Sequence, residues 1–263
     1  MTTAGAPLLS CRSLSKHFGA LAAVDNLSFE VAAGEVLGIG GPNGAGKTTL
    51  FEVISGMNPA SAGEVLFEGR PITRLPPERI CHAGIARSFQ LNAAFDSLTV
   101  HENVAVAAYF GRRNRGTPGL ALDADTRRQT AAALEMVGLA GKREEIARRL
   151  PVLDRKLLML AGALATDPKL LLLDEPVGGL NPAEIDHVVT IIERLRQGGI
   201  TILLIEHVMR FLVRLSSRVL IMHHGEKIYE GSAAGLVRDA TVVDVYLGAG
   251  ASERLRTALE VPG

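Results

Sequence analysis

The feature that most constrains the fold is an apolar pentapeptide, Val36-Leu-Gly-Ile-Gly40, which runs directly into the glycine-rich stretch Gly41-Pro-Asn-Gly-Ala-Gly-Lys-Thr-Thr49. Such an apolar run is typical of a strand that is covered on both faces, as in a parallel sheet. Residues 48–55 are predicted to form a helix. Strand, glycine loop and helix in this order are the context that a phosphate-binding loop requires.

The glycine loop carries the chemistry needed to surround a chain of phosphates. Its glycines let backbone N–H groups turn inward where side chains would clash. The following helix aims its positive N-terminus at the same charge. Lys47 supplies a cation for the β- and γ-phosphates, and Thr48 offers a hydroxyl to Mg²⁺. The residues assigned to nucleotide binding are Gly41, Pro42, Asn43, Gly44, Ala45, Gly46, Lys47, Thr48 and Thr49.

A second motif, Lys169-Leu-Leu-Leu-Leu-Asp174 followed by Glu175, supplies paired carboxylates at the end of a predicted buried strand. Asp174 is suited to hold Mg²⁺ through water, and Glu175 to orient or deprotonate the attacking water. The sequence contains no Asn-Lys-x-Asp motif of the kind that recognises guanine. ATP is therefore favoured over GTP.

The remaining pattern predicts an α/β fold with parallel strands, interrupted by helices between about residues 99 and 165. Further strands are expected at residues 8–18, 22–31, 63–69 and 200–205, a helix at 182–197, a hairpin at 219–222 and 227–229, and a helical tail at 252–260.

Composition limits the class of protein. Lys plus Arg equals Asp plus Glu at 28 each, which does not favour a nucleic-acid partner. The N-terminus lacks signal-peptide features, and the most apolar stretch is interrupted by Thr166-Asp-Pro-Lys169, so a cytoplasmic protein without a membrane span is expected. Cys11 and Cys81 are expected to be reduced thiols. The basic loop Arg112-Arg-Asn-Arg115 is either solvated surface or a contact for anionic lipid or a partner.

These motifs, in this order, resemble the ATPase subunits of ABC transporters over about residues 8–247. The resemblance implies the P-loop NTPase ABC ATPase fold, with a RecA-like core, an antiparallel β subdomain and a helical subdomain insertion. It implies a single ATP-binding domain over residues 1–263. The core and β subdomain would occupy 1–95 and 167–250, the helical subdomain 96–166, and a tail 251–263.

The same resemblance assigns roles to further residues. Gln90, in Ser88-Phe-Gln90, would contact Mg²⁺ and the lytic water and relay nucleotide state to the membrane subunits. His207 would contact the γ-phosphate, and Phe18 would stack on adenine. Gly179-Leu-Asn-Pro182 is similar to the D-loop, with Asn181 where the family usually has Asp.

Residues 84–90, 98–104, 206–209 and 245–248 are similar to the branched-chain amino-acid uptake branch, and more to its longer ATPase subunit. Relatives there import urea, short amides and aromatic acids, so the substrate stays open. The implied partners are two transmembrane permease subunits, a second ABC ATPase subunit or another copy of this chain, and, indirectly, an extracytoplasmic substrate-binding protein. The chain would lie on the inner face of the membrane, with Gln90, Leu91 and Phe95 facing the permease.

The family's signature loop aligns with Leu150-Pro-Val-Leu-Asp154, which has no glycine. In the family this loop donates hydrogen bonds to the γ-phosphate bound by the other ATPase chain. Leu153 would obstruct that approach, Pro151 has no N–H to donate, and Asp154 would place a carboxylate near the triphosphate. Gly162 stands where the family usually has Arg, a change that the sequence does not explain.

The altered signature leaves several outcomes open. The loop can still close with lower activity, or a heterodimer can contain one competent and one degenerate site. A regulatory subunit that scarcely hydrolyses ATP and a soluble ABC ATPase outside transport are the alternative functions.

Overall fold

The computed structural model describes residues 6–88, 94–111, 122–236, 239 and 242. The chain divides into two compact units, one formed by residues 1–75 and 201–263 and the other by residues 76–200. The sequence-based division into subdomains at residues 96 and 166 stays a prediction.

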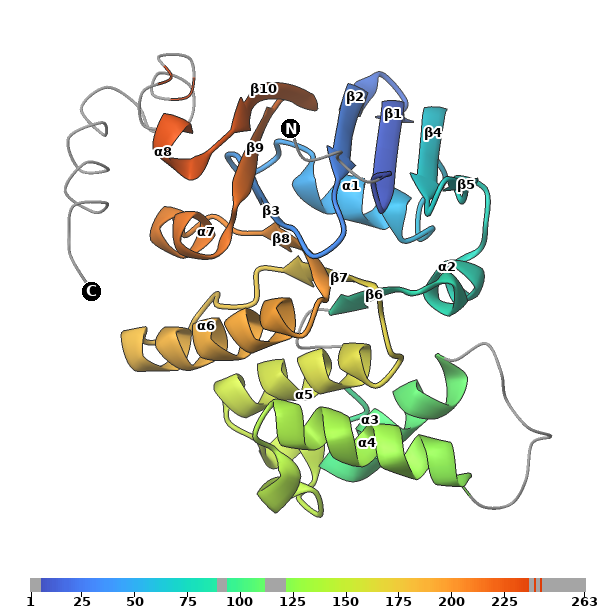
Figure 1. Ribbon diagram of the computed structural model, residues 1–263, viewed down its shortest axis with the longest axis vertical. Helices are drawn as coiled ribbons and strands as arrows, with labels where there is room; N and C mark the ends of the chain where they lie inside the picture. Colours follow the sequence, from blue (N-terminus) through green and yellow to red (C-terminus); the bar gives the residue numbers. More distant parts are fainter. Residues whose placement is uncertain (1–5, 89–93, 112–121, 237–238, 240–241, 243–263) are drawn as a thin grey trace. The chain divides into compact units, whose positions relative to one another are not determined.

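The first unit contains an antiparallel group of strands and a mainly parallel group (Figure 1). The antiparallel strands follow the order β2-β1-β4-β5, and the other group follows β10-β9-β3-β8. In the second group β3 pairs in parallel with β8 and β9, and β10 pairs antiparallel with β9. The strands are β1 (Leu9–Phe18), β2 (Leu21–Val31), β3 (Val36–Gly40), β4 (Ala62–Phe67), β5 (Arg70–Pro71), β8 (Thr201–Ile205), β9 (Arg218–His223) and β10 (Glu226–Gly231). The helices are α1 (Lys47–Ile54), α7 (Met209–Leu215) and α8 (Ala233–Leu236).

Strand β3 forms the core of this unit because every one of its residues is buried. Its glycines allow α7 to pack closely against it. A Cβ at Gly38 would overlap the side chains of Leu212 and Ser216. The apolar run predicted to be covered on both faces is therefore confirmed, and the glycine within it allows close helix packing.

The second unit combines one parallel strand pair with a group of helices. Strands β6 (Ile85–Ser88) and β7 (Leu170–Asp174) are paired in parallel. Helices α3 (Val100–Phe110), α4 (Ala124–Met136) and α5 (Val152–Leu164) pack on one another, and α5 also contacts β6 (Figure 1). Helices α2 (Pro77–Ala83) and α6 (Pro182–Gln197) and the 3-10 turns η2 (Ala140–Lys142) and η3 (Ala147–Arg149) complete the unit.

Reciprocal capping boxes fix where two of these helices begin. Thr99 accepts the N–H of Glu102, whose carboxylate accepts the N–H of Thr99 in return. Asn181 and Glu184 form the same reciprocal box at α6. Each cap satisfies helix N–H groups that have no partner within the helix. These segments therefore have local sequence signals that agree with the fold.

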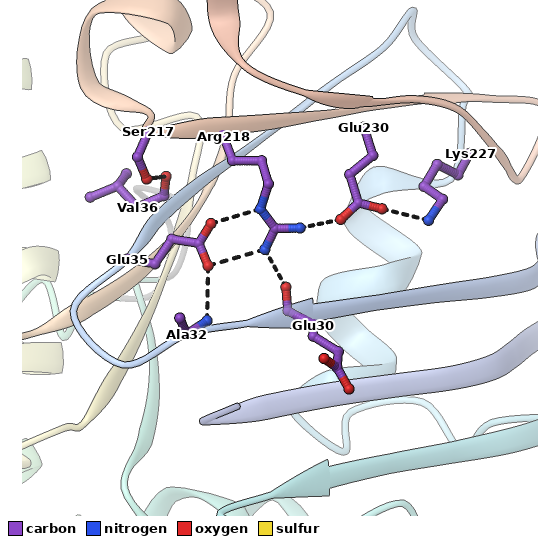
Figure 2. A network of polar contacts seen from close by, with 8 residues as sticks. All are labelled: Glu30, Ala32, Glu35, Val36, Ser217, Arg218, Lys227 and Glu230. Carbon is purple, nitrogen blue, oxygen red and sulfur yellow. Dashed lines mark hydrogen bonds and ion pairs between the residues drawn. The ribbon is translucent and has the colours of Figure 1, made fainter. Parts of the chain in front are cut away.

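A polar network around Arg218 joins four segments of the first unit (Figure 2). The Arg218 guanidinium donates to Glu35 through Nε at 2.8 Å and Nη2 at 3.0 Å. It also donates to the Glu230 carboxylate and the Glu30 carbonyl. Lys227 completes the network by donating to Glu230 at 2.5 Å. These contacts tie the end of β2 and the start of β3 to β9 and β10.

The predicted α/β fold, with a parallel core and an antiparallel β subdomain, is confirmed. Five of the described elements were not predicted: β5, α2, β6, α7 and α8. Each has two to seven residues, which is too short for a periodic signal. The predicted tail helix lies outside the described residues. Among the helices that the structure describes, none has the length and apolarity needed to cross a membrane.

Candidate functional site

The glycine loop follows β3 and leads directly into α1, as predicted. Gly41, Gly44 and Gly46 have φ values of 144°, 79° and 99°, which favour glycine. A Cβ at Gly46 would overlap the carbonyl oxygen of Ala23, and one at Gly41 would overlap that of Met222. The loop is therefore closely packed against two neighbouring strands, and two of its glycines are required on steric grounds.

Lys47 and Thr48 lie where the loop becomes helix. The buried Lys47 ammonium donates to the carbonyls of Gly41 at 2.7 Å and Pro42 at 2.9 Å, so the cation sits over the loop's own backbone. Thr48 is exposed. The helix has no acidic side chain in its first turn, which leaves the positive end of its dipole unopposed locally. This arrangement suits an anion such as a phosphate chain.

The turn between β9 and β10 is hydrogen-bonded to the glycine loop. The Gly225 N–H donates to the Ala45 carbonyl at 3.1 Å, and the Gly225 carbonyl accepts the Asp25 N–H at 2.9 Å. Gly225 has φ of 85°, and a Cβ there would lie 2.9 Å from the Ala22 carbonyl oxygen. The sequence indicated the hairpin but not its role in holding the phosphate loop.

Phe18 ends β1, and 47% of its surface is exposed. The Lys16 ammonium lies 4.8 Å from the centroid of the Phe18 ring and donates to the Pro59 carbonyl at 3.0 Å. A cation at this distance attracts the face of an aromatic ring. Lys16 therefore helps to orient the side chain that was predicted to stack on adenine.

His207 comes two residues after β8 ends, and its side chain is 50% exposed. Beside it, Glu206 is completely buried and accepts the N–H groups of His207 at 3.2 Å and Val208 at 3.3 Å. A buried carboxylate that accepts two backbone N–H groups fixes the turn that carries the histidine. Glu206 is a supporting residue that the sequence did not single out.

The second unit carries Asp174 and Glu175 at the end of β7. Asp174 forms an ion pair with Arg87 of β6, at 2.6 Å between Nη2 and Oδ2, and the two side chains are 9% and 2% exposed. Glu175 follows with φ of 50°, an unusual value for a residue with a Cβ. The sequence predicted both carboxylates but missed Arg87, whose charge balances Asp174.

Gln90 lies outside the described residues, as does Leu91. Phe95, which was also expected to face a permease, is 53% exposed. The buried Asn103 side chain holds its backbone, accepting the Phe95 N–H at 2.8 Å and donating to the Phe95 carbonyl at 3.1 Å. An exposed aromatic side chain is thus presented from a fixed backbone.

Residues 150–154, which were aligned with the signature loop, lie at the start of α5, with Pro151 as the N-cap residue. Leu153 is partly buried. Asp154 is buried and forms an ion pair with Lys142, whose pKa is raised because it donates a hydrogen bond to that carboxylate. The Asp154 carboxylate therefore has a counter-charge within its own unit, which the sequence pattern did not predict.

Of the two other departures expected from the family pattern, at Asn181 and Gly162, only the first has a local explanation. The Asn181 side chain caps α6, and an amide oxygen serves as well as a carboxylate in that role. At Gly162, a Cβ would make ordinary contact with the Cβ of Ala107, at 3.8 Å. The Gly162 site therefore has room for alanine, and nothing in the structure requires glycine there.

Comparisons with known proteins agree with this geometry. Residues 24–178 match the family model described as ABC transporter. The high-affinity branched-chain amino acid transport ATP-binding protein LivG of Escherichia coli is 34% identical over 250 residues, which cover 92% of this chain and 98% of that protein. The corresponding protein BraF of Pseudomonas aeruginosa is 32% identical, with the same coverage.

Solved structures are similar as well. A nucleotide-free ATP-binding cassette from an ABC transporter superposes with a TM-score of 0.84 at 29% identity, over 92% of this chain and 99% of that one. The ADP conformation of an ATP-binding cassette of an ABC transporter gives a TM-score of 0.83 at 30% identity, over 93% and 100%.

Proposed function

Since this chain belongs to the ABC transporter family and is an ATPase of it, we propose that it drives an importer of branched-chain amino acids or of related small amino acids or amides. The observation that carries the proposal is the glycine loop, in which required glycines surround the start of α1 and Lys47 lies over the loop. The relatives named for branched-chain amino acid transport, which match along most of both chains, support this class of substrate.

In the proposed reaction the loop of residues 41–49 binds the phosphates of ATP, and Phe18 supports the base. Glu175 accepts a proton from the attacking water, and His207 contacts the γ-phosphate. A positioned general base contributes about 10²–10⁴ to such a rate. The carbonyl contacts of Lys47 and the two N–H groups held by Glu206 prearrange the lysine and the histidine for these roles.

We assign Mg²⁺ binding to Thr48, Asp174 and Gln90. A hydroxyl and a carboxylate are the hard oxygen donors that Mg²⁺ prefers, and the Thr48 hydroxyl belongs to an exposed residue. When bound, the ion neutralises charge on the phosphate oxygens. Arg87, which pairs with Asp174 at 2.6 Å, keeps that carboxylate in a fixed orientation.

We further propose that the functional dimer is asymmetric, with a second and different ATPase chain as the partner. Leu153 replaces the signature glycine, and Pro151 cannot donate a hydrogen bond from its nitrogen. The site built on this chain's own glycine loop would take an intact signature from the partner. The reciprocal site would bind ATP and hydrolyse it slowly. The ion pair between Asp154 and Lys142 reduces the expected repulsion, so Leu153 is the main obstruction.

Two transmembrane permeases are the proposed membrane partners, and the proposed contact surface is the helical insertion with the surroundings of Gln90, Leu91 and Phe95, of which Phe95 is exposed. The chain would act on the inner face of the membrane and receive substrate indirectly from an extracytoplasmic binding protein. The substitution at Leu153 favours one other candidate, a regulatory subunit that binds ATP and scarcely hydrolyses it.

Reconstitution with both permeases and the second ATPase subunit tests the proposal. We expect ATP-dependent uptake of branched-chain amino acids, with Glu175→Gln lowering ATP turnover at least about 100-fold while ATP binding persists. Glu144→Gln is the matched control, because that side chain is 80% exposed. Brisk turnover by this chain as a homodimer would refute the asymmetric dimer. Uptake with wild-type turnover by Glu175→Gln would identify the regulatory subunit.

A further inference from the structure

Three consecutive residues near the start of α5 make polar contacts inside the second unit. Each side chain reaches a different segment of that unit. The three pairs are Asp154 with Lys142, Arg155 with Asp96 at 2.7 Å, and Lys156 with the Glu175 carbonyl at 3.0 Å. A turn that is fixed in this way offers a rigid base for any group it supports.

The third contact concerns the backbone of Glu175. Its φ of 50° is in the left-handed region, a strained conformation that a residue with a Cβ keeps only where the surroundings hold it. The next residue is Pro176, which further restricts the backbone of the residue before it. Glu175 therefore needs a specific interaction to stay in this conformation.

Lys156 supplies that interaction. Its ammonium donates to the Glu175 carbonyl at 3.0 Å, and the Gly178 N–H donates to the same oxygen at 3.3 Å. A hydrogen bond from a charged donor is about twice as strong as one between neutral groups. Lys156 belongs to α5, so its contact ties the Glu175 peptide to another element of the fold.

We propose that Lys156 is a positioning residue for ATP hydrolysis, which holds the Glu175 backbone so that its carboxylate faces the attacking water. This inference rests on the proposed role of Glu175 as the general base. Misplacing a reacting group by about 1 Å can cost 10²-fold in rate. Removing the Lys156 ammonium should therefore slow the chemical step and leave ATP binding intact.

The neighbouring contacts explain why Lys156 can do this. Arg155 is held by Asp96, and the Asp154 carboxylate lies in the first turn of α5, where it also complements the helix dipole. These two contacts hold the start of the helix that carries Lys156. The segment that replaces the family's signature thus acts within its own chain.

The test uses the reconstituted complex and two substitutions. Lys156→Met keeps the apolar stem and removes the donor, whereas Lys156→Arg keeps a donor. We expect Lys156→Met to lower kcat at least about tenfold with KM for ATP within about twofold, and Lys156→Arg to recover most of that loss. The rate of backbone hydrogen exchange at residues 173–180 should rise in Lys156→Met but not in Lys156→Arg. Arg128→Met, at a side chain 70% exposed, is the matched control.

The outcomes separate the two proposals. Wild-type kcat in Lys156→Met, beside an inactive Glu175→Gln, would overturn the role of Lys156 and leave the proposed function intact. A parallel fall of kcat, ATP affinity and melting temperature in both Lys156 variants would overturn it too, because that pattern indicates a structural role. Full turnover by Glu175→Gln would refute the role of Glu175, and the inference with it.

Discussion

Replacing Arg218 with Met removes the centre of the network in Figure 2 and keeps the apolar stem of the side chain. The substitution deletes the paired contacts to Glu35 and the contacts to Glu230 and the Glu30 carbonyl. Lys227 remains on Glu230 at 2.5 Å, so that carboxylate keeps a cation. Glu35, whose side chain is 12% exposed, keeps only the Ala32 N–H among the contacts drawn. Most of the expected loss of folding free energy therefore arises at Glu35.

The size of the expected loss of folding free energy follows from how exposed the Arg218 and Glu35 side chains are. Breaking a fully buried ion pair costs about 3–5 kcal/mol. The Arg218 side chain is 29% exposed, so solvent screening reduces this figure to about 2–3 kcal/mol. In a chain of this length each kcal/mol lowers the melting temperature by about 2 °C, which predicts a fall of about 5 °C. The pKa of Arg218 is raised, chiefly by its hydrogen bond to Glu35, so the arginine keeps its charge throughout the accessible pH range.

Urea unfolding followed by circular dichroism measures the effect. Combining Arg218→Met with Glu35→Gln should cost less than the sum of the single changes, by about 1 kcal/mol or more. Arg128→Met, whose partner Asp125 is also exposed, should change stability by less than about 0.5 kcal/mol. A loss below about 0.5 kcal/mol for Arg218→Met, or strict additivity of the pair, would refute the reasoning.

Three further outcomes are expected. Gly46→Ala should weaken ATP binding at least about tenfold in equilibrium dialysis, because its Cβ overlaps the Ala23 carbonyl, whereas Gly141→Ala, with nothing within 4 Å, should not. The Thr99 N–H and hydroxyl lower the pKa of Glu102, so its contribution to stability is complete above the ordinary glutamate pKa and is lost as pH falls through the lowered value. In Glu102→Gln this part of the acid dependence of urea unfolding should disappear, and an unchanged pH profile would contradict the assignment. Burial raises the pKa of both thiols, so a thiol reagent at pH 8 should modify Cys81 slowly and Cys11 only on unfolding; fast labelling of native Cys11 would contradict its burial.

The parts of the fold with strong local signals could be predicted from the sequence. The apolar run of β3, the glycine loop and the capping residues of α6 each specify their structure within a few residues. The short helices α2 and α7 could not be predicted, since two turns give no clear period. Their conformation depends on tertiary packing, as the overlap that a Cβ at Gly38 would make with α7 illustrates.

The predicted site residues were found through motifs, and the residues that support them were not. Arg87, Glu206 and Lys156 contact Asp174, His207 and Glu175 respectively. Each supporting side chain lies next to or within a motif, but a charged residue in such a place is more often solvated. Only the pairing of elements in three dimensions shows whether such a charged residue is solvated or supports a site residue. The counter-charge of Asp154 is another such contact, made by a residue of a separate turn.

Strand β3 lies between β8 and β9, and both of its neighbours come from the late part of the chain. The Ser217 hydroxyl, for example, donates to the carbonyl of Val36 across a separation of 181 residues. A ribosome adds about 5–20 residues per second. The nascent chain therefore carries this strand of the nucleotide site, without its partners, for roughly 10–35 s. The phosphate loop can therefore reach its native surroundings only after β8 and β9 have been synthesised.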